Sequence, residues 1–206
     1  MPTTPDIQTI KYYDKHAEEW ATTHGGYEEN SYWEKEMQRF YQLLPKGKIL
    51  EIGSGAGNDA SALIKMGYEY TGIDASSGLI EIAKKRNPKA IFIKMDVCNL
   101  DFPEGYFDGF WTAATLIHIP KSKINIALKQ INRATKVGGI GFISMKKGKG
   151  EKRDPATGRW FAYYSESEFL EVLKRNGFEV IETCIRSEEK DTWLVFYVRV
   201  KKHLSN

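Results

Sequence analysis

A glycine-rich turn that joins an apolar strand to a helix constrains this chain more than any other feature. Residues 49–58 read Ile-Leu-Glu-Ile-Gly-Ser-Gly-Ala-Gly-Asn, and residues 70–74 form a second apolar strand that ends on Asp74. Glycines let a ligand lie close to the backbone, and the N-terminus of the next helix offers unpaired N–H groups to an anion. A carboxylate about 20 residues further on, at a neighbouring strand end, is placed to accept hydrogen bonds from ribose hydroxyls. The two segments predict a nucleoside-cofactor site in an α/β fold.

The spacing of the glycines narrows the choice of cofactor. A dinucleotide fold has the pattern G-x-G-x-x-G, with its third glycine where the helix packs on the strand. In this chain the glycines are at positions 53, 55 and 57, and Asn58 occupies the third dinucleotide position. This argues against a nicotinamide dehydrogenase. With Glu51 two residues before the first glycine, the pattern is Glu-x-Gly-x-Gly-x-Gly, which resembles the first motif of the class I S-adenosylmethionine-dependent methyltransferases.

The apolar pattern predicts one domain over residues 1–206, with an N-terminal helical cover (1–45) and a Rossmann-like core (46–206). Strands are expected at residues 48–53, 68–74, 90–94, 106–113, 140–145, 178–186 and 192–200. Helices are expected at residues 12–21, 33–44 (after a break at Gly25-Gly26), 58–66, 76–87, 122–137 and 165–176. The periodicity of the apolar positions and the Gly, Pro and Asn stop signals set these limits.

This order of elements predicts an α/β, doubly wound sheet. Alternating strands and helices imply a mostly parallel seven-stranded sheet with helices on both faces. A short turn at residues 187–191 joins the last two strands, so we expect an antiparallel hairpin at the sheet edge. An antiparallel C-terminal strand is also a property of the methyltransferase fold that the chain resembles.

Composition favours a soluble, cytoplasmic protein. The 206 residues suit one domain, and 41% hydrophobic with 13% aromatic residues are typical of a globular core. The first six residues are polar, so no signal peptide is expected, and no apolar run reaches the roughly 20 residues of a membrane helix. Cys98 and Cys184 fit neither metal-ligand nor disulfide spacing, and no metal is expected. The net charge of +3 does not select a partner, and the oligomeric state stays open.

The resemblance assigns cofactor roles to residues at the ends of the first four strands. It implies that the glycine turn lies alongside the methionine portion of the cofactor and that Asp74 binds both ribose hydroxyls. Asp96 is expected to accept from the adenine amino group, while the Val97 backbone N–H meets the ring. The Thr112 carbonyl is expected to accept from the methionyl ammonium, and Tyr13 to close over the cofactor. The expected cofactor-binding set is Tyr13, Glu51, Gly53, Ser54, Gly55, Gly57, Asp74, Ala75, Asp96, Val97 and Thr112.

Each of these assignments has a purely structural alternative. Three close glycines also permit tight packing of a strand on a helix. Asp74 could cap the following helix, although Ser76 or Ser77 already serves that purpose. Asp96 could be a solvent-exposed turn residue, and Tyr13 could be one aromatic of an amphipathic helix packed on the sheet.

The methyl acceptor is expected beyond the fourth and fifth strands. His118, just past the fourth strand, is a candidate general base because its ordinary pKa suits proton transfer near neutrality. A positional role is the alternative, since methyl transfer needs no dedicated base. The long connection 146–164 carries six basic and two acidic residues up to position 159, a net charge of +4. Within it, Arg159, Tyr163 and Tyr164 are expected to grip an acidic group and stack on a ring, unless the segment is a solvated loop whose aromatics enter the core.

The sequence therefore predicts methyl transfer from S-adenosylmethionine to the oxygen or nitrogen of a small molecule, with S-adenosylhomocysteine as product. The acceptor is expected to be anionic or aromatic. Residues 112–115, Thr-Ala-Ala-Thr, depart from the Pro-Pro-aromatic pattern of enzymes that methylate amino groups of DNA bases, which argues against that acceptor. The basic segment keeps RNA or protein methylation open. A module that holds the cofactor without catalysis is the third interpretation.

Overall fold

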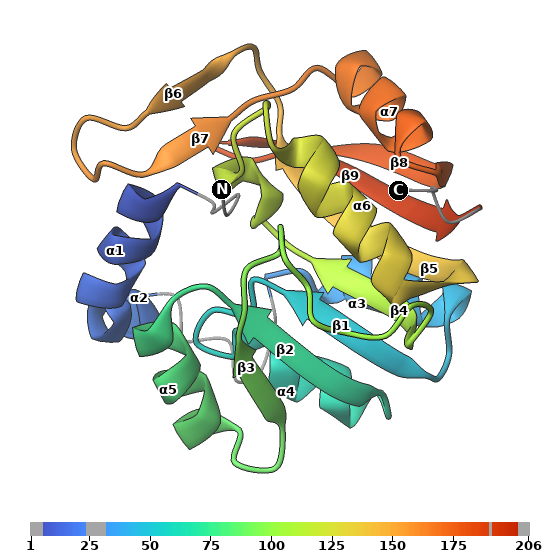
Figure 1. Ribbon diagram of the computed structural model, residues 1–206, viewed down its shortest axis with the longest axis horizontal. Helices are drawn as coiled ribbons and strands as arrows, with labels where there is room; N and C mark the ends of the chain where they lie inside the picture. The colour runs from blue at the N-terminus through green and yellow to red at the C-terminus, as the bar shows by residue number, and fades with distance from the viewer. Residues whose placement is uncertain (1–5, 24–31, 190, 202–206) are drawn as a thin grey trace.

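Seven strands form one sheet in the computed structural model, which describes residues 6–23, 32–189 and 191–201 (Figure 1). The strands are β1 (Lys48–Ile52), β2 (Glu69–Asp74), β3 (Ile91–Lys94), β4 (Phe107–Thr112), β5 (Thr135–Lys146), β8 (Phe178–Ser187) and β9 (Thr192–Val200). Their spatial order is β3-β2-β1-β4-β5-β9-β8. Strands β1 to β5 pair in parallel, and β9 is antiparallel to both of its neighbours. The expected doubly wound sheet with an antiparallel C-terminal strand is confirmed.

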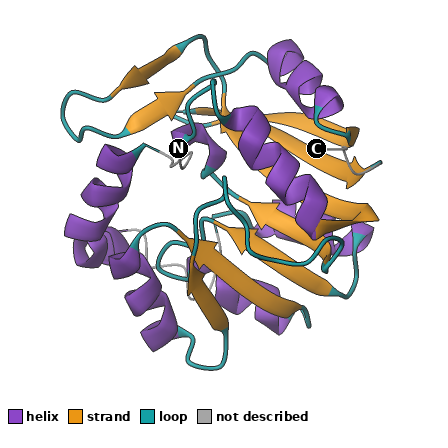
Figure 2. Ribbon diagram, in the orientation of Figure 1, coloured by secondary structure: helices purple, strands orange, loops and turns teal. Residues whose placement is uncertain are grey.

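Helices cover both faces of this sheet (Figure 2). They are α1 (Ile7–Lys15), α2 (Ala17–Thr23), α3 (Glu34–Leu43), α4 (Asn58–Lys65), α5 (Ser77–Arg86), α6 (Ile124–Ala134) and α7 (Glu166–Arg175), with a 3-10 turn, η1 (Leu116–His118). In Figure 1, α6 and α7 lie in front of the sheet and α3 and α4 lie behind it. Within the described residues, no helix has the length and apolarity that a membrane crossing requires.

The strand order reverses in the middle of the sheet. Strand β1 pairs with β2 on one side and with β4 on the other, so the chain moves outward to β3 and then returns across β1. Connections diverge at such a point and leave a crevice outside the carboxyl ends of the strands, where open α/β sheets bind ligands. The fold therefore places a ligand site next to the turn that follows β1.

Aromatic side chains fill the layer between α3 and the sheet. The Trp111 indole stacks on the Phe142 ring with centroids 3.8 Å apart, and Phe40 from α3 meets Trp111 edge-on at 5.6 Å. All three side chains are fully buried, and burial of each contributes about 1.5–3 kcal/mol. The Trp111 Nε1–H donates to the Asp59 carboxylate at 2.9 Å. This bond ties the first turn of α4 to the core, so the floor of the crevice is held by packed rings.

Two expected element boundaries are wrong. The helical stretch 12–21 begins earlier, after the Asp6 cap, and divides into α1 and α2 at His16, whose imidazole Nδ1 donates to the Tyr12 carbonyl at 2.8 Å. The boundary between the helix expected to end at residue 137 and the strand expected to start at residue 140 also lies earlier. Helix α6 ends at Ala134 and β5 starts at Thr135, because Thr135 already pairs with Phe107 ahead of a β-bulge. The expected break at Gly25-Gly26 lies outside the described residues.

The segment 146–164, expected as a loop, contains a two-stranded antiparallel ribbon. Strands β6 (Glu151–Arg153) and β7 (Trp160–Ala162) pair in register, and a hydrogen-bonded turn closes between Asp154 and Arg159. Figure 1 shows the ribbon at the top of the molecule, directly above α1. Two segments far apart in the sequence thus lie side by side over the carboxyl end of the sheet.

Candidate active site

A cavity of about 600 Å³ lies at the carboxyl ends of the parallel strands. Its lining comes from the turn after β1, from the ends of β2, β3 and β4, and from α1, α2 and the ribbon. Small-molecule sites of roughly 300–1,000 Å³ occur at this point of α/β sheets. The cavity therefore has two ends, a sheet end built on strand termini and a cover end built from α1 and the ribbon.

The three glycines of the turn serve three different purposes. Gly53 has φ +73°, and a side chain there would overlap Thr115. Gly55 has φ +53°, and an added Cβ would meet nothing within 4 Å, so the backbone there faces open space in the cavity wall. At Gly57, with φ +79°, an added Cβ would lie 2.7 Å from Asn87 Nδ2. Only Gly53 and Gly55 of the three line the cavity within the described residues, so Gly57 serves the packing of α4 against α5.

Asp74, the last residue of β2, holds the glycine turn in place. Its Oδ2 accepts from the Gly55 N–H at 3.0 Å, and its Oδ1 accepts from the Ser76 N–H at 2.8 Å. Ser76, not Asp74, caps α5, since the Ser76 Oγ accepts from the Leu79 N–H. Burial raises the pKa of Asp74. The carboxylate lines the cavity and has lone pairs left for a ligand's hydroxyls.

Two more carboxylates make the sheet end acidic. Glu51 is buried and lines the cavity, and the Tyr70 hydroxyl donates to it. Burial, with Asp59 nearby, raises the pKa of Glu51 well above its ordinary value. The buried Ser54 Oγ has no hydrogen-bond partner among the described residues, although Ser54 lines the cavity. Clustered acids favour a cationic ligand and disfavour a pyrophosphate, so this end fits the sulfonium and ammonium of S-adenosylmethionine.

Some expected cofactor residues lie at the cavity and others stand behind its wall. Ala75 and Val97 line it. Asp96 is not among the described lining residues, and its Oδ1 accepts from the Cys98 N–H at 2.8 Å, as a turn aspartate does. Thr112 is fully buried, and the cavity is lined instead by the three residues that follow it. The roles of Asp96 and Thr112 toward a cofactor stay predictions.

At the cover end, three side chains from distant segments meet. The Tyr13 hydroxyl on α1 lies 2.9 Å from His118 Nε2, and Arg159 Nη1 donates to the same hydroxyl at 3.0 Å. The other ring nitrogen of His118, Nδ1, lies 2.7 Å from the Trp160 carbonyl. Tyr13, His118 and Arg159 all line the cavity, and their expected roles stay predictions.

The carbonyl partner fixes the tautomer of His118. A carbonyl oxygen only accepts, so Nδ1 carries the proton and Nε2 accepts from the Tyr13 O–H. Burial lowers the pKa of His118 to about 4, because an imidazolium is poorly solvated there and Arg159 is close. The expected general base therefore has its free lone pair engaged by Tyr13, and the positional role is the one that the geometry supports.

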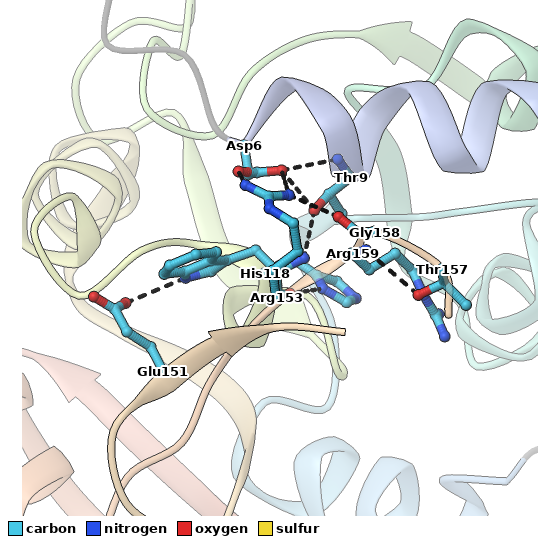
Figure 3. A network of polar contacts seen from close by, with 9 residues as sticks. Asp6, Thr9, His118, Glu151, Arg153, Thr157, Gly158 and Arg159 are labelled. Atoms are coloured by element: carbon cyan, nitrogen blue, oxygen red, sulfur yellow. Dashed lines mark hydrogen bonds and ion pairs between the residues drawn. The ribbon is translucent and has the colours of Figure 1, made fainter. Parts of the chain in front are cut away.

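A network of polar contacts joins α1 to the ribbon (Figure 3). The Asp6 carboxylate, at the start of α1, receives two hydrogen bonds from the Arg153 guanidinium at 2.9 and 2.6 Å. The Trp160 backbone N–H donates to Thr9 Oγ1 at 2.8 Å, and Thr9 also donates to Asp6. The Trp160 indole donates to Glu151 across the ribbon. These bonds hold the cover over the cavity.

Arg159 is surrounded by rings. Its guanidinium lies 5.5 Å from the Tyr13 ring, 5.4 Å from Trp20 and 5.2 Å from Phe161, and each of these residues lines the cavity. Within the described residues Arg159 makes no ion pair. A second cation, Lys146, lies 5.2 Å from the Phe161 ring and pairs with Asp191 at 2.7 Å. Phe161 thus lies 5.2 Å from each of two cations, of which only Lys146 has an acid partner among the described residues.

The structure does not place Tyr163 and Tyr164 at the cavity. Tyr164 is 1% exposed and packs in the core against the Phe169 ring, with centroids 5.0 Å apart. Tyr163 stacks on Phe161 with ring centroids 6.4 Å apart and packs near Gly148. The alternative interpretation, aromatics that enter the core, therefore holds for Tyr164. The reason is that the ribbon ends here and its base rejoins the sheet through a bridge between Lys147 and Tyr164.

Sequence reasoning missed Asp59, Lys146, Phe161 and Trp193, which all line the cavity. Asp59 could have been found, because it lies in the first helical turn directly after the glycine motif. The other three carry no local signal. Trp193 reaches the site because β9 pairs with β5 and sets it opposite Lys146, a register that only the folded sheet establishes.

Several known proteins have sequences similar to this one. A family model described as a methyltransferase domain matches residues 49–139. An uncharacterized protein of Methanocaldococcus jannaschii is 31% identical over 182 residues, which cover 84% of this chain and 83% of that protein. A demethylmenaquinone methyltransferase of Paenarthrobacter aurescens is 28% identical over 119 residues, which cover 58% of this chain and 44% of that enzyme.

A solved structure shows the same fold. The 1,6-didemethyltoxoflavin-N1-methyltransferase of Burkholderia thailandensis, with bound 1,6-didemethyltoxoflavin and S-adenosylhomocysteine, matches with a TM-score of 0.74 at 18% identity. The match covers 98% of this chain and 94% of that chain. At this identity the likeness concerns the fold, and the acceptor has to be inferred from the residues of the cavity itself.

Proposed function

The chain belongs to the class I S-adenosylmethionine-dependent methyltransferases, and from this premise we propose that it methylates an oxygen or nitrogen of a small acceptor that carries an acidic group. S-adenosylmethionine supplies an activated methyl group when it is bound. The observation that supports the acidic group is Arg159, a cavity-lining guanidinium that has no ion-pair partner among the described residues.

The sheet end of the cavity is where we place the cofactor. The backbone from Gly53 to Ala56 would hold the methionine portion, because it is open there to close approach. Asp74 would accept from the ribose hydroxyls, and Met95 with Val97 would border the adenine. Three acids at this end, Glu51, Asp59 and Asp74, complement the positive charges of the donor. This leaves the cover end for the acceptor.

Arg159 would bind the acceptor's acidic group. Two of its N–H groups are used by Tyr13 and Thr157, and a guanidinium has five. A carboxylate or phosphate can take the remaining donors in a two-point hydrogen bond. The rings of Trp20 and Phe161 would pack against the acceptor's body, since both line the same end. An acceptor with a planar body and one acidic group satisfies both features.

The activities named for similar proteins agree with a ring-shaped acceptor. The relative from Paenarthrobacter aurescens is named for demethylmenaquinone, and the Burkholderia thailandensis structure holds 1,6-didemethyltoxoflavin. Both are small molecules. Neither name carries the acidic group that we infer here, so this part of the proposal depends on Arg159 alone.

Positioning would supply most of the rate. Methyl transfer is an in-line displacement from a good leaving group, and holding two reactants in line provides a large part of the acceleration. His118, neutral near physiological pH and bonded to Tyr13, orients the site instead of acting directly on the acceptor. The cover of α1 and ribbon would keep water from the reacting groups.

Large polyanions fit this surface less well. Of the basic residues between positions 146 and 159, Lys146 pairs with Asp191 and Arg153 pairs with Asp6, and both acids lie outside that segment. The positive charge of segment 146–159, which kept RNA open as an acceptor, is therefore partly neutralised. Proteins that bind nucleic acid tightly make roughly 6–10 phosphate contacts, which the remaining lysines of the ribbon do not provide.

The test is methyl transfer to a panel of small molecules with labelled S-adenosylmethionine, read as the mass gain of one methyl group. Matched probes are 2-aminobenzoate and 2-hydroxybenzoate against aniline and phenol, which lack the carboxylate. We expect transfer to the acids at least about tenfold faster, the discrimination that a charged hydrogen-bonded pair supplies. Equal rates on acids and neutral probes, or labelling of RNA or protein only, would contradict the proposal. Calorimetric titration with S-adenosylhomocysteine controls for an intact cofactor site.

A further inference from the structure

The hydroxyl of Tyr13 is held by two partners at the acceptor end. It lies 2.9 Å from His118 Nε2 and 3.0 Å from Arg159 Nη1. Both partners come from the wall of the cavity, one from the 3-10 turn after β4 and one from the ribbon, and Tyr13 itself lines the cavity. Its ring packs on Trp20 in a T-shaped contact with centroids 5.0 Å apart, which restricts the direction of the ring.

The hydrogen bonds around this hydroxyl leave one direction open. A tyrosine hydroxyl has one proton and two lone pairs. The proton goes to His118 Nε2, because the Trp160 carbonyl takes the Nδ1 proton of His118 and so makes Nε2 an acceptor. One lone pair takes the proton of Arg159 Nη1. The second lone pair has no partner among the described residues, so Tyr13 offers an acceptor, and no donor, to a ligand.

This inference rests on the proposed function: we infer that Tyr13 selects the methyl-accepting atom. The Tyr13 oxygen accepts a hydrogen bond from that atom, which must therefore belong to an N–H or O–H group. The hydrogen bond directs the nucleophile's proton toward Tyr13 and leaves its lone pair to form the new bond to the methyl carbon. The carbon–sulfur bond breaks and its electron pair stays on the sulfur of S-adenosylhomocysteine, and the acceptor's proton passes to solvent water as the product leaves. A thioether or a fully substituted amine has no proton to give. It would leave the second lone pair of the Tyr13 oxygen without a partner, and sites that hydrogen-bond a substrate's N–H or O–H discriminate against analogues that lack the donor.

His118 is a positioning residue in this scheme. Its neutral form, with the proton on Nδ1, is what keeps the Tyr13 proton pointed away from the acceptor. The charged groups that face the imidazole agree with a neutral ring: Arg159 and Lys146 lie near it, and Asp6 is engaged by Arg153. Without the imidazole, the Tyr13 hydroxyl would be free to rotate and donate into the cavity. The methyl acceptor would then face a hydrogen-bond donor instead of a hydrogen-bond acceptor.

The first experiment measures the tautomer directly and needs no acceptor. The full chain with bound S-adenosylhomocysteine would be labelled with ¹⁵N, and the ring nitrogens of its four histidines read by NMR. The signal of His118 is the one that His118→Gln removes. We expect an Nδ1-protonated neutral ring between about pH 6 and 8. An Nε2-protonated ring or an imidazolium in that range would overturn the inference.

The second experiment compares matched probes. The protic acids 2-aminobenzoate and 2-hydroxybenzoate are set against 2-(dimethylamino)benzoate and 2-(methylthio)benzoate, which keep the carboxylate but lack the proton. We expect methylation of the protic pair only. Methylation of an aprotic probe would overturn the inference while the proposed function stands. If no acid is methylated although S-adenosylhomocysteine binds, the proposed function fails and the inference with it.

The third experiment uses variants. Tyr13→Phe should lower kcat/KM for the methylated acid about tenfold to a hundredfold and change the Kd of S-adenosylhomocysteine less than about threefold. Tyr12→Phe removes a hydroxyl from the same helix at a position that does not line the cavity, and should change neither. His118→Gln, which retains an acceptor oxygen, should keep more activity than His118→Leu, whereas a purely structural role predicts equal losses. A weaker Kd for Tyr13→Phe with unchanged kcat/KM would assign Tyr13 to the cofactor instead.

Discussion

The two ends of the cavity are built in different ways. At the sheet end, Asp74 meets Gly55 only 19 residues away, and both belong to one strand–turn–helix–strand unit. At the cover end, Tyr13 meets His118 across 105 residues, and Thr9 meets Trp160 across 151. Side-chain hydrogen bonds hold both ends, but those of the sheet end join residues close in sequence and those of the cover end join residues far apart. The difference teaches that the site proposed for the cofactor is formed locally, whereas the site proposed for the acceptor is assembled by the tertiary fold.

The largest expected effect tests the sheet end. Asp74→Ala removes the acceptor of two backbone N–H groups and the proposed partner of the ribose. We expect the Kd of S-adenosylhomocysteine to rise about tenfold to a hundredfold, equal to roughly 1–3 kcal/mol. Calorimetry measures it. An unchanged Kd would remove Asp74 from the cofactor site and contradict the proposal that the sheet end binds the cofactor.

A matched substitution tests whether the effect at the sheet end is specific to Asp74. Asp96→Ala makes the same chemical change at the end of β3, where the carboxylate bonds to Cys98 and does not line the cavity. We expect a smaller loss of S-adenosylhomocysteine affinity than for Asp74→Ala. A loss of equal size would bring Asp96 into the site, as the resemblance implies, and would mean that bound cofactor rearranges the turn after β3.

The next effect tests the cover end. Arg159→Ala should raise the KM of the acidic acceptor about tenfold, because a charged hydrogen bond is lost, while the Kd of S-adenosylhomocysteine stays unchanged. Steady-state kinetics and calorimetry separate the two. Arg159→Lys retains the charge but not the planar fork and should give an intermediate KM. If cofactor affinity falls and the acceptor KM does not, Arg159 belongs to the sheet end and the division proposed here is wrong.

A smaller effect is expected on stability. The Arg153 guanidinium lowers the pKa of Asp6 to about 2, against an ordinary value of 3.8. Because the folded-state pKa is depressed, this pair stabilises the protein above about pH 4, and that contribution is lost as the pH falls toward 2. Asp6→Asn should therefore cost about 1 kcal/mol at neutral pH, as partly exposed ion pairs do, and the difference from the unaltered protein should vanish in acid.

The control for this measurement is Asp101→Asn, an exposed aspartate in the connection between β3 and β4. Urea unfolding at several pH values would give the free energies of unfolding for both variants. We expect the neutral-pH loss for Asp6→Asn only. A constant difference at all pH values would show that Asp6 acts through its helix cap to Thr9 and not through its charge.

The smallest effect is expected for Tyr163→Ala. Tyr163 does not line the cavity, so the acceptor KM should change less than about twofold. Phe161→Ala, the same truncation of the neighbouring ring that does line it, should raise the KM measurably. Equal effects of the two substitutions would restore Tyr163 to the acceptor site.

The sheet end could be predicted from the sequence because its signals are local. The glycine turn, the Ser76 cap and the carboxylate at the end of β2 lie within 26 residues of one another and each obeys a backbone rule. The strand pattern is local too, and it fixes the sheet to within a few residues at most boundaries. Gly57 shows the limit of prediction even at this end. It belongs to the glycine motif, but the reason that a side chain is excluded there is the contact with Asn87 at the end of α5.

The cover end could be predicted only in part. Arg159 and His118 were found because they follow strand ends or stand in a basic segment, and the structure does bring them together. That Phe161, and not Tyr163 or Tyr164, faces the cavity depends on the ribbon and on where its base rejoins the sheet. The bond between Tyr13 and His118 depends on how α1 docks. Neither is encoded in the spacing of residues along the chain.

The position of the last strand has a consequence for how the molecule is completed. Strand β8 leaves the ribosome before β9, yet β9 is its one sheet neighbour in the described chain and separates it from β5. While the chain is being made, β8 has no edge to join until residues 192–200 have docked on β5. A nascent chain or a truncation that stops before residue 192 would therefore lack two strands at once. It would leave the edge of β5 bare, ready to pair with other chains.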